Sequence, residues 1–252
     1  MDDIEGKIIQ NKELAPGYHL LKVKLAKSMD PMMPGQFAMV QVPDSEVFLR
    51  RPFSIYDYGQ RIVSFMYKVV GKGTDSLSRA ERNARVSVLC PLGKGFHIHK
   101  REAYIIVAGG IGIAGVHALT QKLGKRATIF FGCNNISELP LLGDAAKFNS
   151  YVSTLDGSYG FRGNVVQLLA QHMEVMKNEN VEVFACGPEN MLKSLKKLLK
   201  KKGVPCQASF EERMACGLGL CFGCVKKTVD KDEPYKRVCK EGPVFDLWQI
   251  SL

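Results

Sequence analysis

Four cysteines toward the C-terminal end of the chain have the spacing of a metal-binding segment. They follow the pattern C-x4-C-x2-C with a fourth cysteine further on: Cys216, Cys221, Cys224 and Cys239. This is the plant-type arrangement in which four thiolates hold a [2Fe-2S] cluster. Such a cluster needs a tightly bent loop that points backbone N–H groups at its sulfurs, and Gly217, Gly219 and Gly223 permit that bend. The segment therefore predicts an iron–sulfur site.

Two other uses of these cysteines must be weighed. A disulfide framework is less expected, because the chain is 252 residues long and residues 1–5 are acidic, without the apolar core of a secretory signal. A structural zinc site usually shows two C-x2-C or C-x2-C/H-x3-H knuckles rather than one C-x4-C-x2-C segment. The spacing favours iron and sulfur, and zinc remains the alternative.

A second group of candidate residues is the tetrad Arg51, Pro52, Phe53 and Ser54. In an extended strand Arg51 and Phe53 share one face and Ser54 points to the other. Arg51 could then clamp a phosphate while Phe53 and Ser54 meet a ring system. An exposed surface turn is the simpler alternative for an arginine beside a proline.

The glycine-rich stretch Gly71, Lys72, Gly73 and Thr74 precedes a predicted helix over residues 75–81. Free amides and the dipole at a helix N-terminus favour phosphate binding. The stretch therefore predicts a second phosphate-binding element.

Residues 110–115 match G-x-G-x-x-G after a predicted strand. The acidic ribose ligand expected about 20 residues later is missing, since residues 129–135 contain no Asp or Glu, so the usual dinucleotide fingerprint is not assigned. Close backbone approach to a pyrophosphate is still possible along Gly109, Gly110, Ile111 and Gly112. A later strand ends on the same sheet edge in Cys186, Gly187 and Pro188.

A nicotinamide nucleotide across these two loops is the hypothesis that follows, because ligands of open α/β sheets bind at the carboxyl edge. Cys186 could equally be a small buried side chain. Asp156 follows a predicted strand and would disfavour a 2′-phosphate if it faced the adenosine ribose, which favours NAD over NADP.

The elements that must position these residues change in type along the chain. Residues 1–99 are β-rich, with strand patterns at 19–25, 37–42 and 61–70 between turn signals, and predict a small antiparallel barrel. Residues 100–212 alternate between strands and helices and predict a doubly wound parallel sheet. The expected strands are 104–108, 127–132, 151–155, 181–185 and 205–210, and the expected helices are 112–123, 138–148, 164–173 and 190–201. Residues 213–252 are too few to bury much core alone, so the metal site should supply folding energy to this subdomain.

The formal net charge of +10 permits nucleic acid, a membrane surface or an acidic protein as a partner. Much of the excess lies in residues 190–202, where Met191, Leu195, Leu198 and Leu199 recur at helical spacing and lysines fill the other face. This pattern indicates a packed helix with a solvated basic face, which could dock an acidic partner. It lacks the arginines and aromatics of a nucleic-acid site. The uncharged run 104–119 is too short to span a bilayer, so we expect a cytoplasmic protein without membrane or nucleic-acid partners.

The order of these motifs resembles the ferredoxin–NADP reductase superfamily, and the segment from Glu211 to Phe245 resembles the electron-transfer subunits of type B dihydroorotate dehydrogenases. The resemblance implies FAD in the barrel. Arg51 would hold an FAD phosphate, and Gly73 and Thr74 would hold the pyrophosphate. The flavin would be lined by Phe53, Ser54, Tyr67, Lys68 and Val69. It also implies NAD on the second domain and one [2Fe-2S] cluster on the four cysteines. Two departures are Ala114–Gly115, where relatives commonly carry a proline, and Phe53, where many carry a tyrosine.

The function implied by this resemblance is electron transfer in pyrimidine (UMP) biosynthesis. Electrons would pass from the FMN of a catalytic subunit through the cluster and FAD to NAD+, in a heterotetramer with two copies of each subunit. A flavin belongs between the other two carriers because NAD accepts a hydride, a cluster passes single electrons, and a flavin does both. A reductase subunit of a transhydrogenase or hydrogenase complex is one alternative, and a basic zinc-binding interaction module is another.

Overall fold

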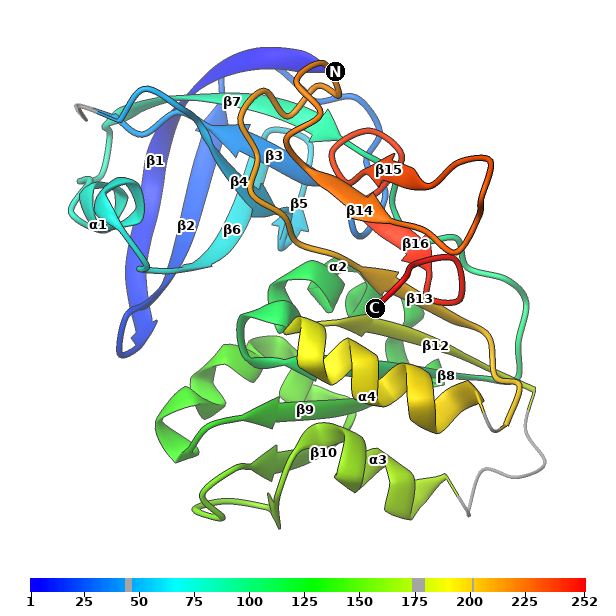
Figure 1. The fold of residues 1–252 in the computed structure, drawn as a ribbon. Helices are drawn as coiled ribbons and strands as arrows, with labels where there is room; N and C mark the ends of the chain where they lie inside the picture. Colours follow the sequence, from blue (N-terminus) through cyan, green and yellow to red (C-terminus); the bar gives the residue numbers. More distant parts are fainter. Residues whose placement is uncertain (44–46, 174–179, 201) are drawn as a thin grey trace.

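The N-terminal part of the chain folds into one antiparallel, barrel-like sheet (Figure 1). The computed structural model describes residues 1–43, 47–173, 180–200 and 202–252. The sheet has the strand order β4-β3-β7-β1-β2-β6-β5. Its strands are β1 (Asp2–Ala15), β2 (Tyr18–Leu25), β3 (Phe37–Val40), β4 (Arg51–Ser54), β5 (Asp57–Tyr58), β6 (Ile62–Lys68) and β7 (Arg85–Leu92).

Alternation along the strands explains the barrel core. On β2 the buried Leu21, Val23 and Leu25 alternate with Lys22 and Lys24, as expected for a strand with one wet face. The predicted helix over 75–81 begins earlier, as α1 (Lys72–Ser78). The glycine-rich stretch therefore forms the first turn of this helix rather than a loop ahead of it.

The second half of the chain forms a mostly parallel sheet below the barrel in Figure 1. Its strand order is β11-β10-β9-β8-β12-β13-β16. The strands are β8 (Ala103–Gly109), β9 (Ala127–Cys133), β10 (Asn149–Thr154), β11 (Phe161–Arg162), β12 (Val181–Cys186), β13 (Cys206–Ser209) and β16 (Val244–Asp246). Since β8 lies between β9 and β12, the winding reverses there, and β8 and β12 flank the switch point at which ligands of such sheets bind.

Helices cover both faces of this sheet. One face packs on α2 (Ile113–Leu123) and η3 (Ile136–Lys147), and the other packs on α3 (Val165–His172) and α4 (Glu189–Lys200). Short 3-10 turns, η1 (Gly110–Gly112) and η2 (Gly124–Arg126), flank α2. The α-helix predicted over 138–148 is instead a 3-10 segment, because it contains Pro140 and bends at Gly143, where φ is 53°. On α4 the buried residues are Leu192, Leu195 and Leu199, so the lysine-rich face is turned away from the core.

The C-terminal segment packs against both larger units. The hairpin of β14 (Val225–Lys227) and β15 (Tyr235–Arg237) is a separate two-stranded sheet, whereas β16 pairs antiparallel with β13. Cys224, Val238 and Cys239 share one buried core with Phe37 and Met39 of the barrel and with the α3 and α4 side of the parallel sheet. The predicted architecture of a barrel, a doubly wound sheet and a small C-terminal subdomain is confirmed.

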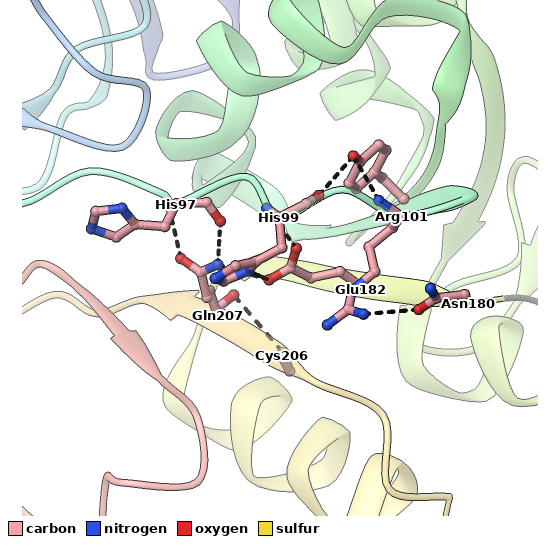
Figure 2. Close-up of polar contacts among 8 residues, drawn as sticks. His97, His99, Arg101, Asn180, Glu182, Cys206 and Gln207 are labelled. Atoms are coloured by element: carbon pink, nitrogen blue, oxygen red, sulfur yellow. Dashed lines mark hydrogen bonds and ion pairs between the residues drawn. The ribbon is translucent and has the colours of Figure 1, made fainter.

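The segment that joins the barrel to the parallel sheet is fixed at the amino edge of that sheet (Figure 2). Glu182 of β12 is buried, and its carboxylate accepts hydrogen bonds from the His99 ring and from Gln207 Nε2, both at 2.8 Å. Gln207 in turn accepts the His97 backbone N–H at 3.0 Å. These contacts hold the connection between barrel and sheet on the side opposite the switch point. Within the described part of the chain, every helix is too short or too polar to cross a bilayer.

Candidate functional site

A cavity of about 570 Å³ opens at the switch point of the parallel sheet. Six of the residues predicted to contact a nucleotide line it: Gly109, Gly110, Ile111, Gly112, Gly187 and Pro188. Gly109 ends β8 and the next three residues form η1, which leads into α2, so free amides of a helix N-terminus face the cavity.

The two loops meet so closely that a side chain has no room between them. A Cβ on Gly112 would lie 2.2 Å from the Cys186 carbonyl oxygen, and one on Gly115 would lie 2.8 Å from Cys186 Sγ and 3.6 Å from Ser54 Oγ. Cys186 is 1% exposed and lies behind these glycines, where burial raises the pKa of its thiol. Gly112 and Gly115 thus allow the two loops, and the barrel residue Ser54, to pack around one thiol.

Residues that sequence reasoning missed close the cavity on the barrel side. The Glu138 carboxylate accepts hydrogen bonds from the Tyr18 hydroxyl at 3.1 Å and from the Asn134 backbone N–H and side-chain amide at 2.9 Å each. Burial acts to raise the pKa of Glu138, but the bonds from Asn134 and Tyr18 outweigh it and lower the pKa below its usual value. Lys68 Nζ lies 4.9 Å from the Tyr18 ring centre. An ionised carboxylate therefore fixes a barrel residue against the nucleotide sheet.

Asp156, the residue proposed to face the ribose, has an exposed side chain at the end of β10. Its carboxylate accepts from the Ser158 N–H at 2.9 Å and the Ser158 hydroxyl at 2.6 Å. These bonds lower its pKa. The neighbouring Leu155, rather than Asp156, lines the cavity.

A second cavity, of about 320 Å³, lies between the barrel and the C-terminal segment. Seven of the residues predicted to contact a flavin line it: Arg51, Pro52, Phe53, Ser54, Tyr67, Lys68 and Thr74. Gly73 lies beside Arg51, since a Cβ there would be 2.6 Å from Arg51 Nε. The Thr74 hydroxyl accepts the N–H groups of Val70 and Gly71 and so shapes the turn. Val69 packs toward the barrel core, and Val70 lines the cavity in its place.

The two cavities share a wall. Lys68, Ile111 and Glu211 line both of them. Glu211 follows β13 and was noted in the sequence only as part of the cysteine-rich segment. The Glu211 side chain is exposed to the cleft. Protein atoms nevertheless surround its carboxyl and displace part of its water, which raises its pKa. Met214, two residues before the first predicted cluster ligand, lines the second cavity as well.

The four predicted cluster ligands form two pairs. Cys224 Sγ and Cys239 Sγ lie 3.1 Å apart and are buried, and burial followed by the contact with Cys224 raises the pKa of Cys239 to about 12. Burial acts to raise the pKa of Cys216 too, but the N–H groups of Leu218, Cys221 and Leu220 and the Cys221 thiol lower it to about 6. A [2Fe-2S] cluster requires two thiolates for each of its two irons. The positive charge of the irons would stabilise the thiolate forms of Cys224 and Cys239, which burial alone disfavours.

The loop between the first three cysteines is bent by left-handed residues. Gly217 has φ 69° and Gly219 has φ 78°, while the third such residue is Phe222 at φ 55° rather than the predicted Gly223. Backbone N–H groups point back at the sulfurs, with Leu218 N 3.4 Å from Cys216 Sγ and Gly223 N 3.5 Å from Cys221 Sγ. The donor set and the inward amides fit an anionic cluster.

Comparison with known proteins assigns the chain to a family. Residues 211–251 match the family model described as the iron–sulfur cluster binding domain of dihydroorotate dehydrogenase B. The chain is 33% identical to a dihydroorotate dehydrogenase B (NAD(+)) electron transfer subunit homolog of Aquifex aeolicus, over 99% of each chain. It is 35% identical to the electron transfer subunit of Fusobacterium nucleatum, over 96% of each. The chain belongs to the dihydroorotate dehydrogenase B electron transfer subunits.

Solved structures agree with this assignment at the level of the fold. The structure of an NADH-dependent reduced ferredoxin-NADP oxidoreductase superposes with a TM-score of 0.86 at 23% identity, covering 98% of this chain and 89% of the other. A ferredoxin NADP+ reductase from Neisseria gonorrhoeae with bound FAD and NADP superposes with a TM-score of 0.66 at 15% identity, covering 83% and 93%. The fold implied by the resemblance is thereby confirmed.

Proposed function

We propose that this chain is the oxidoreductase subunit that links dihydroorotate oxidation by an FMN-containing partner to NAD+ reduction in pyrimidine (UMP) biosynthesis. The proposal divides it into an FAD-binding unit over 1–99, an NAD-binding unit over 100–212 and a [2Fe-2S] unit over 213–252. The assembly would be a cytoplasmic heterotetramer with two copies of each subunit. The relatives named above carry the corresponding activity in their names.

One observation carries the proposal. The two cavities share Lys68, Ile111 and Glu211, and the segment that leads into the cysteine loop lines the second cavity through Met214. A flavin and a nicotinamide must touch for hydride transfer, and a cluster must lie close by for electron transfer. The cavities and the cysteine segment provide that order in space.

Residues of the barrel would hold FAD. When bound, flavin and cluster together supply the exchange between single electrons and a hydride. Arg51 would pair with the FAD phosphate as a charged fork, next to the first turn of α1, which Gly73 leaves open. Phe53, Ser54 and Tyr67 would line the ring system, and Tyr67 is fixed by its hydroxyl bond to Asn11 at 3.1 Å.

Residues after β8 and β12 would hold NAD. The amides of residues 109–112 would face the pyrophosphate, and Gly187 and Pro188 would cover the nicotinamide half beside Lys68 and Glu211. Glu138 and Asn134 keep Tyr18 against this cavity and so keep the barrel closed over it. Asp156 is engaged by Ser158, so we assign the preference for NAD over NADP to the family rather than to this residue.

The exposed apolar side chains of the cysteine loop suggest where the catalytic subunit docks. Leu220 and Phe222 are 76% and 61% exposed beside the cluster ligands. Apolar groups gathered at an exposed loop are typical of protein interfaces. Docking there would bring the partner's FMN toward the cluster.

The test is to purify the chain anaerobically with its cognate catalytic subunit and to measure dihydroorotate-dependent NADH formation. The proposal expects this activity together with FAD and two irons per chain. If the chain carries flavin and iron but accepts electrons only from a different donor, it belongs to a different redox complex. A colourless chain that contains zinc would favour the interaction module.

A further inference from the structure

Arg237 contacts three parts of the cysteine segment at once. It belongs to β15 and lies two residues before Cys239. Its Nε and Nη2 donate to the Glu241 carboxylate at 3.0 and 2.5 Å, and its Nη1 donates to the Gly219 carbonyl at 2.8 Å. Its guanidinium also lies 4.7 Å from the centre of the Phe222 ring. One side chain thus joins the strand of the fourth cysteine to the loop of the first three.

The contact with the Gly219 carbonyl also affects the N–H on the other side of the same peptide bond. The carbonyl of Gly219 and the N–H of Leu220 belong to one planar group. That N–H is directed at the Cys216 sulfur, and the N–H of Gly219 itself is directed at the Cys239 sulfur. Fixing the carbonyl at Arg237 therefore fixes the direction of an amide that points at a predicted cluster ligand.

The larger side chains of the loop add little to its stability. Leu218, Leu220 and Phe222 are 37%, 76% and 61% exposed, so burial of their side chains contributes little. Gly217, Gly219 and Phe222 are in the left-handed region, which is unfavourable for Phe222. Stacking of the Arg237 guanidinium on the Phe222 ring stabilises the one non-glycine residue among them.

We propose that Arg237 is a positioning residue that holds the cysteine loop in its cluster-binding shape, with Glu241 orienting the guanidinium. Glu241 also accepts the Arg237 backbone N–H at 2.7 Å, so the pair is fixed at both ends of the side chain. The Glu241 carboxylate balances the positive charge of Arg237. The role of Arg237 is therefore to fix the geometry of the loop rather than to add charge beside the cluster. A lysine cannot replace it, because one ammonium lacks the planar fork that serves a carboxylate and a carbonyl together.

The inference rests on the proposed cluster ligands, and the test separates the two. Holoprotein variants Arg237→Gln, Arg237→Lys and Glu241→Gln are compared with wild type for iron content and for the rate of cluster loss to a chelator, followed by absorbance. Lys227→Gln is the matched control, since it removes an exposed positive charge from the same subdomain. Metal-free protein is also treated with chymotrypsin, and cleavage after Leu220 or Phe222 is measured.

We expect both Arg237 variants to lose the cluster about tenfold faster or more, as for residues that orient the ligands of other metal sites. Faster cleavage of the metal-free loop should accompany this loss. Glu241→Gln should change both in the same direction by less, and Lys227→Gln should match wild type. Equal retention in Arg237→Lys and wild type would overturn the role of the fork. If Arg237→Gln does not fold, unchanged loop cleavage and cluster loss in Glu241→Gln would overturn the proposal. A wild-type protein without iron would instead refute the cluster itself.

Discussion

The Lys226 ammonium lies 2.8 Å from the Glu189 carboxylate and joins the cysteine segment to the first turn of α4. The same ammonium lies 2.6 Å from Glu212 and its side chain is 13% exposed. Glu189 directly follows Pro188 of the nucleotide loop, and Glu212 directly follows Glu211. Lys226 therefore ties the nucleotide loop, the wall between the cavities and the segment after Cys224 to one another.

Lys226→Met should destabilise the protein by about 1 to 2 kcal/mol, because it leaves two carboxylates without their partly buried cation. Urea unfolding of the holoprotein at neutral pH measures this change. Lys193→Met is the matched control, since Lys193 also pairs with Glu189 at 2.8 Å but is 42% exposed, and should cost about 0.5 kcal/mol or less. Equal losses in the two variants would contradict the role of Lys226.

Arg51→Ala should weaken FAD binding by about 10- to 100-fold, the range expected for one lost charge-assisted contact. Flavin content after dialysis and titration with FAD measure the effect. Arg50→Ala is the control, because the neighbouring Arg50 pairs with Asp3 at 2.7 Å instead of lining the cavity. Unchanged flavin content in Arg51→Ala would show that Arg51 does not hold the phosphate.

Gly112→Ala should weaken NADH binding by about tenfold or more, because its Cβ would meet the Cys186 carbonyl at 2.2 Å and push the two nucleotide loops apart. Flavin and iron content should stay at wild-type levels. Gly59→Ala is the control, since a Cβ there meets nothing within 4 Å. The affinity of both variants for NADH is measured by titration. A wild-type affinity in Gly112→Ala would contradict the placement of the nucleotide.

NADH affinity should fall as the pH rises through the elevated pKa of Glu211. Below that pKa the carboxyl is neutral, and above it a negative charge faces the anionic dinucleotide across the shared wall. We expect a loss on the order of 1 kcal/mol, or roughly fivefold. Glu211→Gln should flatten this pH dependence, as measured by NADH titration between about pH 5 and about pH 9. The same slope in variant and wild type would rule Glu211 out as its cause.

Most of the residues that the sequence singled out as nucleotide or flavin contacts line the two cavities. The cysteine spacing, the tetrad and the two glycine-rich stretches are contiguous motifs, so each can be found without knowing the fold. Pairing partners distant in sequence could not be read in the same way. Glu138 meets Tyr18, and Arg237 meets Gly219, only because the fold brings separate segments together.

Some local predictions failed for identifiable reasons. β1 (Asp2–Ala15) was not expected, although Ile4 and Ile8 are buried and alternate with the exposed Glu5 and Lys7 as in a strand with one wet face. The segment η3 resembled an α-helix in its apolar spacing, but Pro140 and Gly143 break it. Glu138, which lies beyond the range 129–135, was not singled out, because its bonds to Asn134 and to the distant Tyr18 depend on the fold.

The most direct test of the central claim is low-temperature EPR of the anaerobically purified protein before and after NADH. If the nucleotide cavity, the flavin cavity and the cysteine loop form one electron path, a rhombic [2Fe-2S] signal appears on adding NADH to wild type. In Gly112→Ala the signal should appear with dithionite but only weakly with NADH. A wild-type protein that contains iron and flavin, gives the signal with dithionite and stays silent with NADH would contradict the connected path.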